Sequence, residues 1–267
     1  MGSEIIKRGE ILPDHIWSAQ TNINNPDLVY SIHKDNILSG ATHITTNTFR
    51  TTPRAYSKTI DSYNKAKSLS IESMKSAVYE ARRAAKQDTL ILGSIAPLED
   101  CYMPNLYPGD LVAREEFEEI GLMLAKEGVD ILLLETMNSI SETKACLDAI
   151  SEFNLPIWIS FVLKNSKELL SGEKLEDAII ALKDYNVDVL LLNCNPLDRT
   201  QDAMGIVSEN WNGEWGIYPN LGIGEPSPDG IIESVHSDED YISLMDESVK
   251  LGATILGACC GSNTRHI

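Results

Sequence analysis

The chain has 267 residues, of which 43% are hydrophobic and 23% charged, a balance that excludes a largely disordered or fibrous protein. Its 40 acidic residues outnumber its 22 basic residues by 18, which disfavours nucleic acid or an anionic membrane surface as a partner. No run of 18 apolar residues predicts a membrane span, and the first ten residues lack the apolar core of a secretory signal. We therefore expect a cytoplasmic protein whose five cysteines are core thiols, catalytic groups or metal ligands rather than disulfides.

Seven apolar runs rich in Ile, Leu and Val predict buried parallel strands. In chain order they cover residues 42–47, 89–97, 130–136, 156–163, 187–194, 214–220 and 254–260. The stretches between them predict helices over 26–38, 53–87 (long enough for two), 117–127, the segment that follows Ser141 as its cap, 175–185 and 238–251.

The repeated order of helix, short loop and buried strand is typical of βα units. Eight units would close a (β/α)8 TIM barrel, and the count of seven places the missing first strand before Met1. An open doubly wound sheet is the alternative, although neither GxGxxG nor GxxxxGK[ST] occurs. With no linker in the sequence, we expect a single domain over residues 1–267, and the Gly- and Pro-rich segment 221–230 is a predicted loop.

Three cysteines, Cys194, Cys259 and Cys260, each end a predicted strand. The carboxyl ends of parallel strands carry the active site in such folds, so the three sulfurs are expected to converge. Three sulfurs with an open fourth position are a donor set typical of catalytic zinc. The alternatives are small buried fillers, or a disulfide between the adjacent pair. Cys146 falls in a predicted helix and Cys101 in a loop, away from this site.

Polar residues at other strand ends are candidates for substrate binding. Glu135 follows four apolar residues, so its carboxylate needs a cationic or hydrogen-bond-donating partner. That partner is either the ammonium group of an amino-acid substrate or a structural group. Thr45, Thr46 and Thr48 could hydrogen-bond a carboxylate, although threonine is also a common strand residue. Asn193 is expected to orient the loop after its strand, and we include it with the substrate-binding candidates.

Several segments, in order along nearly the whole chain, resemble the homocysteine S-methyltransferase family of zinc-dependent thiol methyltransferases. They are GATHITTNTF (40–49), GSIAP (93–97), VDILLLETMNSISETKA (129–145), PIWISF (156–161), LLLNCNP (191–197), YPNLG (218–222) and GATILGACCGSNTRHI (252–267). The resemblance implies a (β/α)8 barrel with one Zn²⁺ held by Cys194, Cys259 and Cys260. It also implies that Glu135 holds the substrate amino group and that Thr48 lines the substrate pocket.

The activity implied by this resemblance is methyl transfer to the thiol of homocysteine, which gives methionine through a zinc-bound thiolate. The methyl donor is an unidentified small molecule. Trp17 with Tyr102 or Tyr107 could form an aromatic pocket for a cationic methyl group, or could serve ordinary loop packing.

The two ends of the chain depart from the family pattern. The family's first strand, with its Asp-Gly-Gly turn, would lie before Met1, and its last helix would lie after Ile267, so we expect the given chain to lack both. Unpaired sheet edges would then favour a homo-oligomer and lower the stability. One rival hypothesis is a truncated, non-catalytic barrel that binds zinc or a thiol amino acid without turnover. Another is a zinc-free barrel that binds phosphate through the glycines at 222, 224 and 261.

Overall fold

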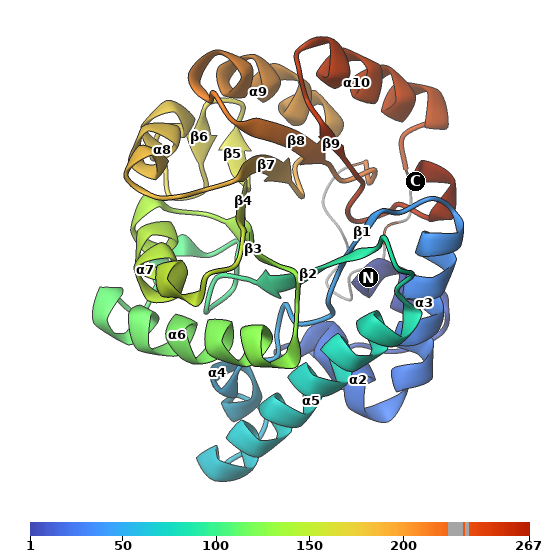
Figure 1. The fold of residues 1–267 in the computed structure, drawn as a ribbon, viewed down its shortest axis with the longest axis vertical. Helices are drawn as coiled ribbons and strands as arrows, with labels where there is room; N and C mark the ends of the chain where they lie inside the picture. Colours follow the sequence, from blue (N-terminus) through green and yellow to red (C-terminus); the bar gives the residue numbers. More distant parts are fainter. Residues whose placement is uncertain (224–231, 233–234) are drawn as a thin grey trace.

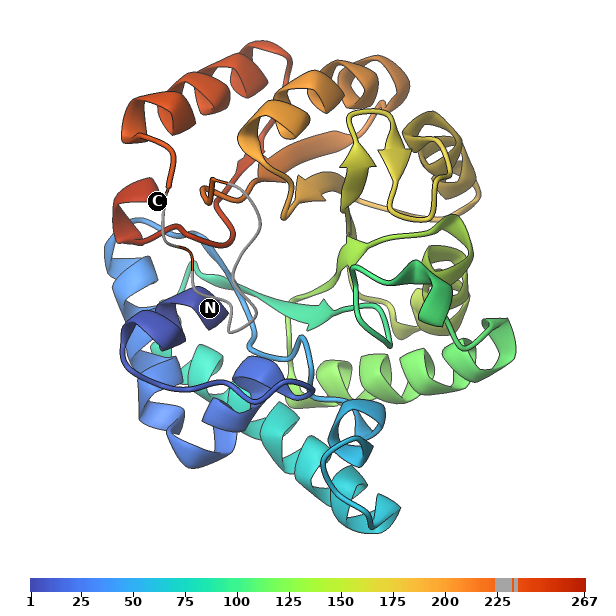
Figure 2. The same cartoon turned by 180° about the vertical axis from the view of Figure 1, so that it is seen from behind.

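The main sheet has seven parallel strands that curl around a common axis, with helices on the outside (Figures 1 and 2). The structure is a computed structural model that describes residues 1–223, 232 and 235–267. In sheet order the strands are β1 (His43–Thr45), β2 (Leu90–Ile95), β3 (Ile131–Met137), β4 (Ile157–Phe161), β7 (Val189–Asn193), β8 (Glu214–Tyr218) and β9 (Ile255–Leu256).

The strand order follows the chain order without reversal, with β1 and β9 at the two ends of the sheet. A doubly wound sheet reverses its strand order at a switch point, so that alternative is wrong. The predicted α/β barrel architecture and the count of seven strands in the main sheet are confirmed. A separate two-stranded sheet, formed by β5 (Leu163–Asn165) and β6 (Glu168–Leu169), follows β4 and was not predicted.

The helices precede or connect the strands, as βα units require. They are α1 (Gly2–Lys7), α2 (Thr21–Asn24), α3 (Pro26–Leu38), α4 (Pro53–Ser57), α5 (Tyr63–Ala84), α6 (Asp110–Glu127), α7 (Ile140–Ile150), α8 (Leu175–Ala181), α9 (Leu197–Asn210) and α10 (Asp238–Lys250). The prediction of two helices within 53–87 is confirmed by α4 and α5. No helix in the described part of the chain is long and apolar enough to cross a membrane.

Three predicted boundaries were wrong. Helix α7 is capped by Ser139, whose hydroxyl accepts a hydrogen bond from the Glu142 N–H (3.4 Å), so Ser141 lies within its first turn. Helix α6 begins at Asp110, after Gly109 with its φ of 95°, and not at Phe117 as predicted. Leu111 and Val112 in its first turn are exposed, so they do not continue the buried apolar face on which the prediction relied. Strand β9 covers only Ile255–Leu256, so it is shorter than the predicted run 254–260. Helix α9 was missed, and from residue 224 onward the predicted loop 221–230 lies outside the described residues.

Apolar side chains pack on both faces of the sheet. The larger cluster lies between the sheet and the surrounding helices and includes Leu132, Leu134, Ile159 and Leu192. The smaller cluster, which we call the inner cluster, lies on the opposite face of the strands, inside the barrel. Its buried members are Leu92, Ile131, Leu133, Trp158, Val189 and Leu191, with Tyr218 and Ile255 packed against them. Because strand side chains alternate between faces, each strand supplies both clusters.

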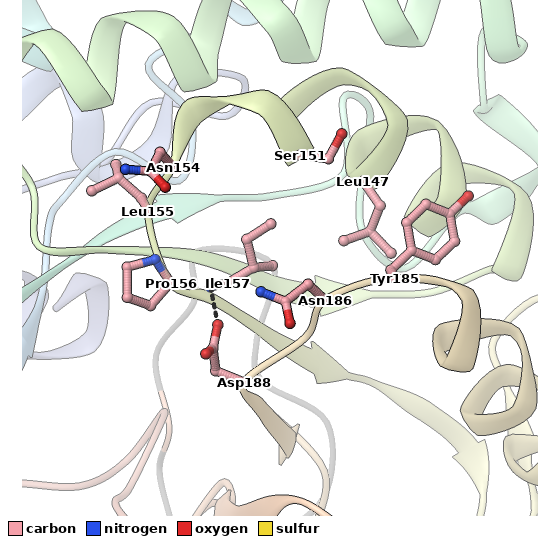
Figure 3. Close-up of a pocket in the computed structure, with 9 residues that line it drawn as sticks. All are labelled: Leu147, Ser151, Asn154, Leu155, Pro156, Ile157, Tyr185, Asn186 and Asp188. Carbon is pink, nitrogen blue, oxygen red and sulfur yellow. Dashed lines mark hydrogen bonds between the residues drawn. The ribbon is translucent and has the colours of Figure 1, made fainter.

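The amino ends of the strands carry carboxylates with a structural role. Asp130 accepts a hydrogen bond from the Ile91 N–H, and Asp188 accepts one from the Ile157 N–H, both at 2.8 Å. A pocket of about 310 Å³ lies at this end, between the end of α7 and the loop before β7 (Figure 3). Its lining includes Asp188 beside Ile157, so it opens at the starts of β4 and β7. In barrels of this class, this end serves stability, and the site lies at the other end.

Candidate metal centre

Three cysteine sulfurs converge at the carboxyl ends of the strands, as the sequence predicts. Cys194 directly follows β7, and Cys259 and Cys260 come shortly after β9. All three Sγ atoms lie within 4.8 Å of one another, with Cys194–Cys259 at 2.7 Å and Cys259–Cys260 at 3.9 Å. They are half-buried, and in the described part of the chain no other group of three or more His, Cys, Asp or Glu side chains converges in this way. The alternative of a disulfide between the adjacent cysteines is wrong, because their sulfurs are not bonded.

The segment after β8 ties the two cysteine-bearing loops together. The Asn220 side-chain amide donates to the Cys194 carbonyl (3.0 Å), and its carbonyl oxygen accepts from the Cys260 N–H (3.1 Å). The Cys259 N–H donates to the Pro219 carbonyl (2.8 Å). Cys194 itself has a φ of 54°, in the left-handed region that a non-glycine residue seldom adopts. The sulfurs therefore converge because the backbone on either side is held by specific hydrogen bonds.

The donor set and its spacing fit zinc. Sulfurs bound tetrahedrally at about 2.3 Å from zinc lie roughly 3.8 Å apart. The Cys259–Cys260 separation meets this value, and the Cys194–Cys259 pair would open by about 1 Å. Hydrogen bonds with Cys259 and Cys260, together with burial, raise the pKa of the Cys194 thiol. A cation at the centre of the cluster would reverse this effect, because it stabilises the thiolate form of each ligand.

Below the cysteines, polar side chains fill the barrel interior. We define the polar layer as Ser94, Glu135, Ser160, Asn193 and Tyr218, from β2, β3, β4, β7 and β8 respectively. Four of these residues come two positions after an inner-cluster residue of the same strand, and Tyr218 packs on that cluster directly. A period of two keeps side chains on the same face of a strand, so the layer faces into the barrel above the apolar cluster.

Glu135 lies in this layer with one fixed partner. The Ser94 hydroxyl donates to the Glu135 carboxylate, and Thr46 in turn accepts a hydrogen bond from the Ser94 N–H (3.1 Å). Burial raises the pKa of Glu135, and the Ser94 hydrogen bond opposes that rise. No basic side chain forms an ion pair with Glu135 among the described residues. The structural ion pair that the sequence left open is therefore not formed.

Asn193 is fully buried, and both ends of its amide are engaged. Its oxygen accepts from the Thr136 N–H (3.0 Å) and the Ser160 hydroxyl (2.6 Å), and its nitrogen donates to the Thr136 hydroxyl (2.9 Å). Thr136 has a φ of 61°, which is exceptional for a β-branched residue. Asn193 thus stabilises the irregular part of β3 directly after Glu135, and not only the loop after its own strand. Direct contact of Asn193 with a substrate stays a prediction.

Thr48 is also buried and engaged. Its hydroxyl donates to the Ser94 carbonyl (2.8 Å) and lies 2.8 Å from the Thr46 hydroxyl. Both threonines therefore support Ser94 and, through it, Glu135. A direct role for Thr48 in the substrate pocket stays a prediction.

The remaining candidates lie in different surroundings. Cys101 is buried in the loop after β2 and Cys146 within α7, outside the cluster, as predicted. Tyr102 is 54% exposed, and the nearby Cys194 is the main cause of a raised pKa of its phenol. The Tyr107 hydroxyl donates to Asp110 (2.8 Å), while Trp17 packs close to Gly2. Of these three aromatic residues, Tyr102 is the one whose pKa the cysteines affect most.

Two of the three glycines of the phosphate hypothesis, Gly222 and Gly261, are close together in the structure. A Cβ on Gly261 would lie 3.1 Å from the Gly222 backbone nitrogen, so these two glycines pack against each other. The third, at position 224, lies outside the described residues.

Sequence reasoning missed Ser94, Ser160, Asn220 and Tyr218. The hydroxyl of Tyr218 is buried and has no hydrogen-bond partner in the part of the chain that the structure describes. Burial, and then the Glu135 carboxylate, raise the pKa of this phenol. The period of two within each strand is the signal that could have found the three layer residues, because each lies near the carboxyl end of a strand on its inward face.

The fold and the cluster define a class: an α/β barrel with a three-thiol site at the carboxyl ends of its strands. Comparison with known proteins gives the family. The model of the family described as homocysteine S-methyltransferase matches residues 1–267. A homocysteine S-methyltransferase from Escherichia coli is 27% identical over 285 residues, which cover 100% of this chain and 91% of that protein. A selenocysteine methyltransferase from Astragalus bisulcatus is 26% identical over 294 residues, covering 97% of this chain and 86% of that protein.

The crystal structure of the homocysteine methyltransferase MmuM from Escherichia coli, in its metallated form, superposes with a TM-score of 0.84. It is 24% identical in sequence, and the match covers 100% of this chain and 91% of that one, which supports the shared fold. The chain belongs to the homocysteine S-methyltransferase family, so the resemblance of its motifs is confirmed. Membership places it among the methyltransferases.

Proposed function

We propose that the protein transfers a methyl group from a small-molecule donor to the thiol of homocysteine, which gives methionine, with zinc held by Cys194, Cys259 and Cys260. The observation that carries this proposal is the convergence of three sulfurs at the same end of the strands as a polar layer that contains Glu135. This arrangement offers a metal position for a thiol and a carboxylate for an ammonium group within one barrel mouth.

The chemistry needs the acceptor sulfur as a thiolate. A free thiol has a pKa near 8.5, so only a small fraction is ionised at neutral pH. Bound zinc, with one position left open by the three cysteines, would supply the charge that ionises a substrate thiol. The thiol proton leaves to solvent, the sulfur forms a bond to the methyl carbon, and the leaving group of the donor departs with the electron pair.

The side chains of the barrel would position the substrate for this step. Glu135, oriented by Ser94, would accept hydrogen bonds from the substrate ammonium group. Asn193 would hold the irregularity of β3 at Thr136, which directly follows Glu135. Asn220 would keep the two cysteine loops at a fixed spacing. Holding the reacting groups in place in this way removes much of the entropic barrier of a two-substrate reaction.

The acceptor is the second point to test. Relatives named for homocysteine and for selenocysteine match at nearly the same identity, 27% and 26%. Both acceptors carry an α-amino acid head and a soft nucleophile, so the same site suits either one. A comparison of kcat/KM for the two acceptors would rank them.

The decisive experiment is a donor panel with zinc-loaded protein and homocysteine. The donors are betaine, S-methylmethionine, S-adenosylmethionine and methylcobalamin, and methionine is measured by mass spectrometry. We expect methionine from at least one donor with the wild type and none with Cys260→Ala. If homocysteine binds in calorimetry but no donor gives methionine, the non-catalytic alternative holds instead. If no zinc co-purifies and inorganic phosphate binds, the phosphate hypothesis holds.

A further inference from the structure

The Tyr218 hydroxyl is a buried hydrogen-bonding group that the proposed chemistry has not yet used. It lies at the end of β8, in the polar layer, and among the described residues it has no hydrogen-bond partner. Buried polar groups are almost always paired, so an unpaired hydroxyl in a functional site indicates that a ligand completes it.

The other members of the layer are already engaged with one another. The Ser94 hydroxyl donates to Glu135, and the Ser160 hydroxyl donates to Asn193. The Asn193 amide nitrogen donates to the Thr136 hydroxyl. The Tyr218 hydroxyl lies near Glu135 and Ser160 but forms a hydrogen bond with neither, so within the layer its donor is left for a ligand.

The ring of Tyr218 is held in place. It packs on the inner cluster, and the residue pairs with Asn193 in the sheet. On its other side, a Cβ on Gly257 would come 3.1 Å from the Tyr218 Cβ, so the segment after β9 packs closely against Tyr218. The Tyr218 carbonyl also accepts from the Cys194 N–H (3.3 Å). The hydroxyl is thus a fixed donor rather than a mobile one.

Glu135 and Tyr218 are complementary to one kind of ligand. A carboxylate accepts hydrogen bonds and a phenol hydroxyl donates one, so a ligand that meets both needs a donor and an acceptor close together. An α-amino acid carries its ammonium and carboxylate groups on the same carbon. An amine without a carboxylate would satisfy Glu135 and leave Tyr218 unpaired.

We propose that the Tyr218 hydroxyl donates a hydrogen bond to the α-carboxylate of the acceptor substrate and thereby selects an α-amino acid thiol over a simple aminothiol. This inference rests on the proposed function, because it takes Glu135 as the site of the substrate ammonium group. Selectivity arises because a site built to hydrogen-bond a substrate group discriminates against a substrate that lacks it.

The test compares two acceptors with two proteins. The acceptors are homocysteine and 3-aminopropane-1-thiol, which is homocysteine without its carboxylate. The proteins are the zinc-loaded wild type and Tyr218→Phe, which removes only the hydroxyl. Loss of one hydrogen bond to a charged group weakens binding by about 10- to 100-fold. We expect a rise of that size in the KM and calorimetric Kd for homocysteine, and less than about a threefold change for the aminothiol, since it has no carboxylate to lose.

The matched control is Tyr185→Phe, which removes a hydroxyl that donates to Asp148 (2.7 Å) on the outside of the barrel. It should leave both acceptors unaffected. The wild type alone gives a second measurement, independent of how well the variant folds: it should bind homocysteine about 10- to 100-fold more tightly than the aminothiol.

Two results would overturn the inference while the proposed function stands. One is a wild type that methylates homocysteine and a Tyr218→Phe variant with the same affinity for it. The other is an equal loss for both acceptors, which would make Tyr218 a general structural residue. A wild type that neither binds nor methylates homocysteine with zinc bound would instead overturn the proposed function itself.

Discussion

At the amino ends of the strands, Asp130 and Asp188 accept hydrogen bonds from backbone N–H groups near the start of neighbouring strands, whereas at the carboxyl ends Glu135 faces the barrel interior. The first two carboxylates are paired with backbone groups, while Glu135 has a raised pKa caused by burial. Positive φ values occur at both ends, because Asn154 (φ 52°) precedes β4, but asparagine adopts this region readily, whereas Thr136 and Cys194 at the carboxyl end seldom do.

This difference shows which end of the barrel has polar and sulfur-containing side chains that can bind a ligand or a metal. The amino end holds its side chains in stabilising contacts. The carboxyl end holds a thiol cluster, the half-buried carboxylate of Glu135 and a buried hydroxyl that has no partner among the described residues, each of which is costly unless a ligand or metal completes it. Strain and unpaired polar groups concentrated at one end are typical of a functional site.

The largest effect is expected from the cysteines. Cys259→Ala leaves two protein sulfurs, and we expect zinc affinity to fall by more than about 100-fold, since even residues that only support ligands change it by 10- to 100-fold. Methyl transfer should be lost with the metal. Zinc per chain is measured by elemental analysis after dialysis. The matched control is Cys146→Ala, buried in α7, which should keep its zinc. Equal zinc loss in both variants would contradict the assignment.

A smaller loss is expected when the bridge between the cysteine loops is removed. Asn220→Ala deletes the hydrogen bonds to the Cys194 carbonyl and from the Cys260 N–H, so zinc affinity should fall by about 10- to 100-fold. Competition with a zinc-binding dye measures this directly. Asn210→Ala is the control, because Asn210 donates to the Ile206 carbonyl at the end of α9, away from the site. Wild-type zinc affinity in the Asn220 variant would contradict the claim that this side chain holds the cysteine loops in position for zinc.

Glu142 is expected to make stability depend on pH. It is buried, accepts from the Leu98 N–H (2.9 Å), and burial raises the pKa of its carboxyl group from 4.5 to about 7. The folded state therefore binds the proton more tightly than the unfolded state, and this group lowers the stability as pH rises from about 4.5 through about 7. Glu142→Gln keeps an acceptor and removes the ionisation.

The measurement is urea unfolding of wild type and Glu142→Gln between pH 4.5 and 8. The variant should gain on the order of 2 kcal/mol over the wild type across this range. The exposed Glu115→Gln on α6 serves as the control and should show no such gain. A constant difference between Glu142→Gln and wild type at every pH would show that Glu142 ionises normally in the folded protein.

The smallest effect is expected at the amino end. Asp188→Ala removes one hydrogen bond to the Ile157 N–H and should lower the free energy of unfolding by about 1 kcal/mol. Methyl transfer should stay within about twofold of wild type, because a single paired group at that end is remote from the chemistry. A large loss of activity without loss of stability would contradict the claim that the amino end serves stability and the carboxyl end serves the reaction.

Much of the fold and the convergence of the three cysteines could be predicted from the sequence, because buried parallel strands give continuous apolar runs and strand ends meet at one rim. Cys194, Cys259 and Cys260 were found in this way. Ser139 was missed as a cap because Ser141, two residues on, fits the same pattern.

The supporting residues could not be predicted as readily. Asn220 acts through its side-chain amide on two loops that are distant in sequence, and no local pattern records those contacts. Asn193 was expected to orient the loop after its own strand. Its partners, Thr136 and Ser160, lie instead on β3 and β4. These contacts can be recognised only when the register between the strands is known.

The most direct test of the central claim is zinc X-ray absorption spectroscopy of the loaded protein, with and without homocysteine. The account predicts three sulfur neighbours at about 2.3 Å and one lighter neighbour without substrate, and four sulfur neighbours when homocysteine is added. A spectrum with fewer than three sulfurs, or one that homocysteine leaves unchanged while it binds, would contradict the claim that the cysteine cluster and the acceptor thiol share one metal.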